Sequence, residues 1–316
     1  MNKWKILLVL IVLFFVVGQK CEIGKKKSNI AEDDFSGTKG LVLNFVDGLP
    51  PKEVWKGIDF GIWVDVHNQG VEDVSNGKVC IGSLPNSIFT KSDSCLDLGN
   101  IAGRGNFPGG EIKSFGEESW DGFSIKEDYK VNIDTGYPII AKTCYEYSTI
   151  LAPLVCVRDL RMNEKEAVCN AGEIKLESKG QGAPVSVTYL KEDIIPRGDE
   201  NELFFTLKVR NEDTGDVINK NSIDSGKGSS KCSFERKDQN IVNIEIDMPG
   251  FGKGNCKNDG KIVLVNGEGQ AFCSGIKVPK EESFSLPLNI KLTYGYLSHI
   301  RGEFTIKKDI AEGKLK

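Results

Sequence analysis

The sequence has few of the residues that common enzyme classes require. Its 316 residues include two histidines and no Cys-x-x-Cys pair. The Gly-x-Ser-x-Gly, His-Glu-x-x-His and Walker patterns, which position nucleophiles, zinc or phosphate, do not occur. His67 is expected at a solvent-facing strand end, and His299 in a turn or loop after Tyr296, both as surface side chains without a partner. We therefore predict no catalytic residues and no enzymatic activity.

The sequence also lacks an excess of positive charge. Lysine and arginine number 41 against 45 aspartates and glutamates, which gives a net charge of −4 and a pI near 5.5. Binding to nucleic acid depends on clustered lysine and arginine side chains that neutralise phosphates. No nucleic-acid partner is expected.

Long apolar runs are absent except at the N-terminus, where residues 6–17 are all apolar and follow Lys3 and Lys5. This pattern is typical of a secretory signal, so residues 1–18 are predicted to be a hydrophobic signal peptide or membrane-anchor helix. A helix of this run spans about 18 Å, less than the ~30 Å of a bilayer core. Cleavage after Gly18 and retention as an anchor both stay open. Lipidation of Cys21 is disfavoured because Lys20 precedes it.

Residues 19–38 form a polar tether in this interpretation, because they carry runs of lysine and acidic residues with few apolar residues between them. The remainder of the chain is then expected on the outer face of the cytoplasmic membrane or the cell surface. The membrane, through the N-terminal segment, and other surface proteins or envelope components are the expected partners.

Nine cysteines in an exported chain predict disulfides, since the space outside the cytoplasm lets them persist. No Cys-x-x-Cys spacing or neighbouring histidine favours zinc. Three pairs bracket short segments, and we predict them to be bonded: Cys80 with Cys95, Cys156 with Cys169, and Cys256 with Cys273. Cys144 and Cys232 are left over, and the sequence does not settle the pairing.

The strand pattern is strongest at residues 58–70, where Ile58, Phe60, Ile62, Val64 and Val66 fall on every second position and so share one face of a strand. The alternation recurs 143 residues later, with Leu203, Phe205, Leu207, Val209 and Asn211 matching positions 60, 62, 64, 66 and 68. Each copy runs into a polar turn with a glycine. The chain is therefore predicted to be duplicated.

A second repeated pattern supports the duplication, because residues 145–149 match residues 294–298 at an offset of 149. Many short alternating segments, glycine turns and no convincing amphipathic helix after residue 18 predict an all-β sandwich class. Asn266-Gly267 is the strongest hairpin signal. Strands are also expected at residues 123–133 and, closing the two copies, at residues 154–157 and 304–306.

No cofactor is expected, and two ligand hypotheses are disfavoured. Asp213, Asp216 and Asp224 fall in one predicted loop, but their spacing is not that of a calcium loop. Repeated tyrosines at equal positions favour core or corner residues over a carbohydrate platform. The glycine-rich residues 82–122, predicted as loop with few strands, are a better place for binding specificity.

Four segments carry a resemblance to a known family: Gly48-Leu49-Pro50-Pro51, Val66-His67-Asn68-Gln69-Gly70, Cys144-Tyr145-Glu146-Tyr147 and Gly182-Ala183-Pro184-Val185. Over about residues 40–308 the chain resembles exported archaeal proteins with tandem immunoglobulin-like domains of the cell-adhesion-related (CARDB) type. The resemblance implies immunoglobulin-like β-sandwiches at 39–160 and 183–308, joined by a linker at 161–182, with a tail at 309–316. It supplies no catalytic residues, and residues 82–122 depart from its pattern.

The expected function is that of a non-enzymatic, exported cell-surface protein with an adhesive, envelope-structural or partner-binding role. The alternative is a soluble secreted accessory module that binds a ligand or glycan through residues 82–122, which cleavage of the N-terminal segment would favour.

Overall fold

The computed structural model describes residues 36–116, 119–158, 161, 168–176, 180–224, 232, 234–280 and 283–309. The predicted signal or anchor segment, most of the tether and most of the tail lie outside these residues. Within them no helix is long and apolar enough to cross a membrane. The chain from Asp33 to Lys316 forms one compact unit.

The regular structure of the described residues consists mainly of antiparallel strands, as the alternating pattern predicted. The largest sheet has the order β14-β13-β19-β7-β4-β5, with β2 and β12 also paired to β19 and β16 to β13. Its strands are β2 (Glu53–Val54), β4 (Gly77–Gly82), β5 (Ser94–Asp97), β7 (Thr135–Leu151), β12 (Asp216–Ile218), β13 (Ile241–Met248), β14 (Gly252–Lys253), β16 (Lys261–Val263) and β19 (Asn289–Ile306).

Three smaller sheets complete the fold. Their orders are β1-β3-β6, β15-β17-β11-β10-β9 and β18-β8. Their strands are β1 (Leu41–Phe45), β3 (Val64–Asn68), β6 (Ile112–Phe115), β8 (Leu154–Val157), β9 (Glu173–Lys175), β10 (Val185–Arg197), β11 (Glu200–Asn211), β15 (Asn255–Cys256), β17 (Glu268–Pro279) and β18 (Phe284–Pro287). The described helices are short: α2 (Asn221–Asp224) and the 3-10 turns η2 (Arg236–Asp238) and η3 (Asn258–Gly260).

The two repeated patterns occupy equivalent places in these sheets. β3 lies between β1 and β6, and β11 lies between β10 and β17. Ile62, Val64, Leu203 and Leu207 on the predicted inward faces are each less than 1% exposed, whereas Ile58, predicted on the same face, lies before β3 and is 58% exposed. The alternation therefore identified both central strands and the face that each buries.

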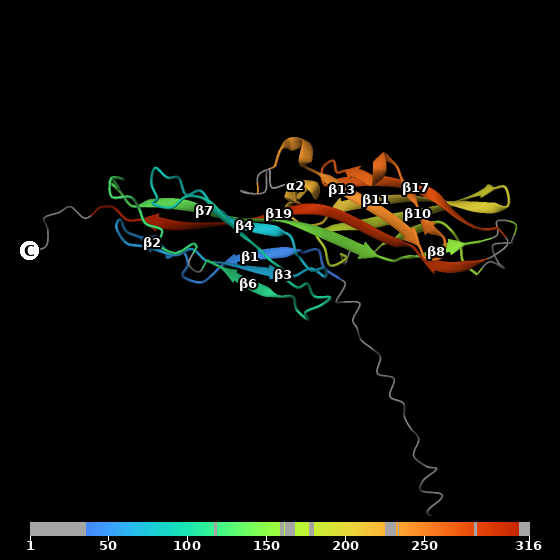
Figure 1. The fold of residues 1–316 in the computed structure, drawn as a ribbon, viewed down its shortest axis with the longest axis horizontal. Helices are drawn as coiled ribbons and strands as arrows, with labels where there is room; N and C mark the ends of the chain where they lie inside the picture. Colours follow the sequence, from blue (N-terminus) through green and yellow to red (C-terminus); the bar gives the residue numbers. More distant parts are fainter. Residues whose placement is uncertain are drawn as a thin grey trace, which may run out of the picture. The chain divides into compact units, whose positions relative to one another are not determined.

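β7 and β19 join the two repeats by pairing with each other along nearly their whole lengths, from Ile290 opposite Leu151 to Ile306 opposite Thr135. Figure 1 shows these two long strands side by side. Glu146 pairs with Gly295, which stands at its own repeat offset of 149 residues. Exchanging the repeats leaves the pairing unchanged, so the two strands have local two-fold symmetry. The predicted domain boundaries stay a prediction, but the repeats share one sheet.

Several sequence expectations need correction. β3 begins only at Val64, because Phe60 makes an isolated bridge with Phe123 instead of joining the strand. Residues 123–133 form no strand and contribute isolated bridges through Phe123 and Ile125. His299 lies within β19, and the predicted closing strand at 304–306 is the end of that same strand. The alternation of apolar residues within one segment does not show how far a strand continues when it pairs with a strand that is distant in the sequence.

Residues 82–122 are more ordered and more buried than an exposed loop. They include β5 and β6, and Trp120 is fully buried, with its Nε1–H donating to Ser94 Oγ at 2.9 Å. Phe89 and Ile101 are also buried. Glycines in this region had suggested loop, but the apolar residues between them complete the core of the first repeat.

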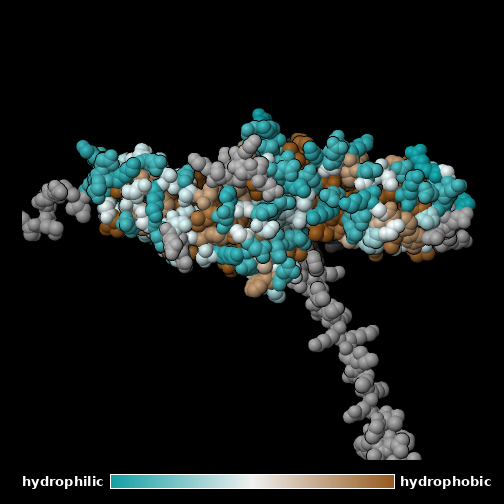
Figure 2. Space-filling view, viewed as in Figure 1, coloured by the Kyte–Doolittle hydropathy of each residue, from teal (hydrophilic) through white to brown (hydrophobic). Residues whose placement is uncertain are grey.

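On the face visible in Figure 2, hydrophobic residues form separate patches among hydrophilic ones.

The Asn266-Gly267 turn is present as predicted. Both residues have positive φ, 53° and 79°, and Val265 and Glu268 bridge across them. Only residues that tolerate left-handed backbone conformations close such a two-residue hairpin without strain.

Asn68 and Asn211 stabilise equivalent turns after the two central strands. The Asn68 side-chain amide donates to Glu72 O at 2.9 Å, and that of Asn211 donates to Gly215 O at 2.8 Å. Asn68 also donates to Ile101 O and accepts from Gly70 N, and it is fully buried. Each amide thus satisfies backbone groups that the turn leaves without a ladder partner.

Replacing Asn68 by alanine should lower the free energy of unfolding by about 2 to 3 kcal/mol, because buried backbone groups lose their partners. Asn211→Ala should cost less, about 1 to 2 kcal/mol, since Asn211 is only partly buried. Chemical denaturation measures both changes. Asn86→Ala in an exposed turn is the control and should leave stability within about 0.5 kcal/mol. Equal effects at positions 68 and 86 would contradict the turn-stabilising role.

Candidate functional site

Four buried tyrosines gather where the repeats meet. Tyr145, Tyr147, Tyr294 and Tyr296 are at most 2% exposed, and their ring centroids lie 5.8 to 6.4 Å apart around the cluster. Tyr145 is opposite Tyr296, and Tyr147 is opposite Tyr294. They are core residues, so the disfavoured reading as a carbohydrate platform is wrong.

The tyrosine hydroxyls bind the same structural points in both repeats. Tyr145 Oη accepts from Leu41 N at 2.9 Å, and Tyr294 Oη accepts from Val185 N at 3.3 Å, at the start of β1 and β10. Burial raises the pKa of both hydroxyls, so they stay protonated. Because these tyrosines share one face of the long sheet, the sheets that contain β1 and β10 both cover that face.

The other tyrosine pair holds the turns described above. Tyr147 Oη accepts from Glu72 N at 3.2 Å, and Tyr296 Oη accepts from Gly215 N at 3.0 Å. Tyr296 Oη also donates to Asn211 Oδ1 at 3.1 Å. The cluster therefore connects the shared sheet to the strand starts and turns of both repeats.

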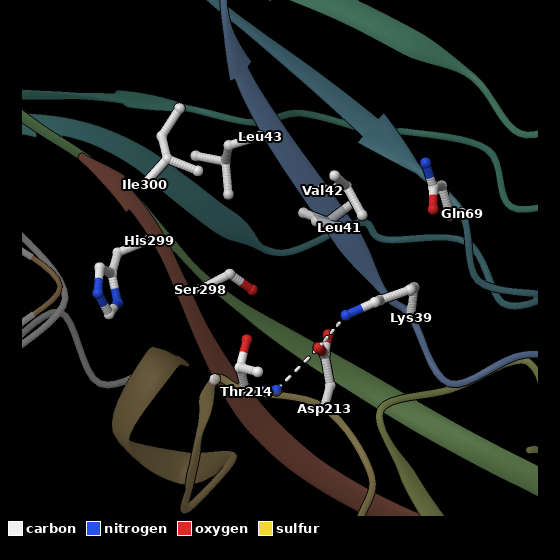
Figure 3. A pocket seen from close by; sticks show the side chains of 11 residues that line it. Lys39, Leu41, Val42, Leu43, Gln69, Asp213, Thr214, Ser298, His299 and Ile300 are labelled. Carbon is white, nitrogen blue, oxygen red and sulfur yellow. Dashed lines mark hydrogen bonds and ion pairs between the residues drawn. The ribbon is translucent and has the colours of Figure 1, made fainter. Parts of the chain in front are cut away.

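A pocket with a mixed polar and apolar lining opens beside this junction, between β1, the turn at residues 213–215 and β19, with a volume of about 380 Å³ (Figure 3). Lys39 and Asp213 form an ion pair across it, and Asp213 Oδ1 also accepts from Thr214 N at 2.8 Å. The Asp213 side chain is 8% exposed. Because Lys39 and a backbone N–H already bind the Asp213 carboxylate, this carboxylate is not free to bind a ligand in the pocket.

The residues considered for calcium and catalysis are not brought together. Asp216 lies in β12 and Asp224 ends α2, while Asp213 pairs with Lys39. Among the described residues no three His, Cys, Asp or Glu side chains form a metal-binding group. His67, expected without a partner, does have partners: its Nε2–H donates to Gly109 O at 2.8 Å, and Nδ1 accepts from Gln69 Nε2 at 3.3 Å.

A second hollow lies on the outer, solvent-facing side of the five-stranded sheet, with a volume of about 540 Å³. We name it the outer groove, lined by Asp193, Ile195, Phe204, Thr206, Lys257 and Phe272. Phe272 is 45% and Ile195 38% exposed, although they occupy the side of β17 and β10 that alternation makes polar elsewhere. The sequence does indicate this groove, because Phe204 and Phe272 alternate with the buried positions 203, 205, 271 and 273 and so place aromatic side chains on the opposite, outer side of their strands.

The described cysteines form four disulfides. Those bracketing short segments are Cys80–Cys95 between β4 and β5, Cys156–Cys169, and Cys256–Cys273 between β15 and β17. The two cysteines that the sequence left over, Cys144 and Cys232, form the fourth. Such a set is typical of an oxidising, extracellular environment.

Residues 218–224, which contain α2, cover the far face of the shared sheet at Gly295, and Cys144–Cys232 joins β7 to a residue that follows them in the chain. Gly295, at the local two-fold, lies under this segment, and a Cβ there would come within 2.7 Å of the side chains of Ile218 and Ile223. Cys232 Sγ also lies 3.6 Å from Cys80 Sγ. Two disulfides therefore pack against each other beneath the cover.

Glu192 is an unusual buried carboxylate at the other end of the second repeat. It is 2% exposed, its Oε2 accepts from Cys156 N at 2.9 Å, and among the described residues its Oε1 has no hydrogen-bond partner. Nearby, Asn201 Nδ2 donates to Arg158 O at 3.2 Å. In the part of the chain that the structure describes, β8 pairs only with β18, and these two side chains lie at its other edge. Desolvation raises the pKa of Glu192 to about 7, with a smaller contribution from the charge of Asp193.

A scan against models of known protein families finds no match, and a search of curated proteins finds no significant relative. The functional inference therefore depends on the disulfides, the shared sheet and the two hollows.

Glu192 should make the protein less stable as pH rises from about 4.5 to about 7. In that range the folded state keeps a proton that the unfolded state, with a pKa near 4.5, has lost, so its stabilising effect disappears as pH passes through the folded pKa. A pKa displaced this far corresponds to about 3 kcal/mol. Denaturation of Glu192→Gln should show a correspondingly flatter pH profile. The exposed Glu245→Gln variant should follow the parent, and an unchanged Glu192→Gln profile would contradict the assignment.

Removing Cys144–Cys232 should destabilise the chain more than removing Cys156–Cys169. The first joins residues 88 apart and the second residues 13 apart, and a longer closed loop restrains the unfolded chain more. With both cysteines changed to alanine, we expect losses of about 4.5 kcal/mol and about 3 kcal/mol, respectively. Urea denaturation of the two double variants measures the order, and a reversed order would refute this account.

Proposed function

We propose that this chain is a non-enzymatic exported protein that displays two linked immunoglobulin-like repeats at the cell surface for binding to a partner. The observation that carries the proposal is the set of four disulfides holding an all-β fold. Disulfides of this number are typical of proteins in oxidising surroundings. The basic and apolar N-terminal segment agrees with export.

The distribution of polar groups also supports a binding role rather than catalysis. The two histidines lie on different strands, β3 and β19, and His67 already uses both ring nitrogens. Asp213 is neutralised by Lys39. The five-stranded sheet presents a hollow of about 540 Å³, and a site built on hydrogen-bonded strands loses little conformational entropy on binding.

A soluble secreted ligand-binding module is the second candidate function. The outer groove favours it, because a hollow of about 540 Å³ is within the range of small-molecule sites, about 300 to 1,000 Å³. In this version the ligand would bind the five-stranded sheet instead of residues 82–122, whose aromatic residues are largely used in the core.

The location distinguishes the two candidates. Intact cells should expose the protein to a membrane-impermeant amine-reactive label, and the washed membrane fraction should retain it. Intact mass should rise by about eight hydrogen masses on reduction, two for each disulfide. Recovery of the labelled protein only from the culture medium, with its N-terminus after Gly18, would select the soluble module. Labelling only after lysis, without a mass gain, would overturn both.

A further inference from the structure

We propose that the outer groove is a binding site for an acidic saccharide, with pyranose rings stacked on Phe204 and Phe272 and a sugar carboxylate bound by Lys257. The proposal deepens the proposed function, on which it rests, by naming a ligand class.

The aromatic part of the groove is exposed on a polar sheet face. Thr206 pairs directly with Phe272 across β11 and β17, and Phe204 lies two residues further along β11 on the same face. The two rings thus flank a small polar side chain, which leaves a hollow between them. The carbon–hydrogen face of a pyranose is apolar and matches such rings, whereas its hydroxyl groups need polar partners at the rim.

Local backbone irregularity shapes this hollow. The register between β11 and β17 shifts beside Phe204, where Ser274 and Gly275 together face one residue of β11. Gly275 has a φ of 91°, which favours glycine, and a Cβ there would come 3.1 Å from Asn255 Nδ2. β-bulges re-aim side chains and are enriched beside functional sites. The Cys256–Cys273 disulfide joins β15 to β17 next to the bulge and holds Lys257 at the rim.

The charge of the groove favours an anionic ligand. Lys257 Nζ lies 5.4 Å from the centre of the Phe272 ring, and in the described part of the chain it has no carboxylate partner. Asp193, the carboxylate that lines the groove, is bound by Lys191 at 2.9 Å. A carboxylate on the ligand would therefore meet an ammonium group that is already positioned over the ring and not neutralised by the protein.

The size of the groove favours a saccharide over a protein partner. A stable protein interface needs about 800 Å² from each side. Around the groove, however, the same sheet face carries charged side chains such as Glu202, Lys208 and Lys277. The exposed apolar side chains of β10 and β17, Ile195 and Phe272, both line the hollow, whose volume is that of a small-molecule site.

The test uses the full disulfide-bonded chain in isothermal titration calorimetry. The probe is a tetrasaccharide containing glucuronic acid, and its carboxyl-reduced, neutral counterpart is the matched ligand. We expect the acidic sugar to bind at least about tenfold more tightly than the neutral one. Phe272→Ala should weaken the binding of both sugars at least about tenfold. Lys257→Gln should remove only the preference for the acidic sugar.

Lys253→Gln on β14, outside the groove, is the control and should bind like the parent. Unchanged melting and four intact disulfides would show that each variant folds. Equal binding of the two sugars would overturn the role of Lys257. Absence of binding, or binding of an acidic peptide alone, would overturn the saccharide assignment. Surface labelling of cells is independent of these results, so a failed ligand class and a failed proposed function are separate outcomes.

Discussion

The pairing of β7 with β19 is the interaction on which the rest of the structure depends. It places four tyrosines on one face of a shared sheet, where burial makes each hydroxyl costly unless it is hydrogen-bonded. Their partners are backbone N–H groups of residues 41, 72, 185 and 215. Satisfying these hydroxyls therefore fixes where β1 and β10 begin and where the turns after β3 and β11 close.

The local two-fold explains features that neither repeat explains alone. At its centre, Gly295 faces the covering segment with α2, whereas the equivalent residue in the first repeat is Glu146. A side chain at residue 295 would collide with Ile218 and Ile223, so the second repeat has glycine at this position. The duplication is therefore symmetrical on the tyrosine face and asymmetrical on the far face, where Cys144–Cys232 joins a residue that follows the covering segment to a strand of the first repeat.

Sequence patterns predicted the features that depend on neighbouring residues. Alternation identified the buried faces of β3 and β11, and Asn266-Gly267 identified a hairpin turn. These patterns did not predict the 17-residue length of β7 or the position of His299 within β19, because both depend on a partner strand about 150 residues away. The outer groove had a local signal in Phe204 and Phe272, but only the pairing of β11 with β17 brings the two rings to one place.

The junction and the outer groove use opposite sides of the same strand. On β11, Phe205 and Leu207 point into the core that the tyrosines help to close, while Phe204 and Thr206 point into the groove. Because a strand alternates its side chains, substitutions on the groove side leave the core residues untouched. Phe272 is 45% exposed and lies on the side of β17 that faces away from the core. A hydrophobic ring that contributes little to the core, held beside a bulge and an unneutralised lysine, is better explained by a ligand than by packing.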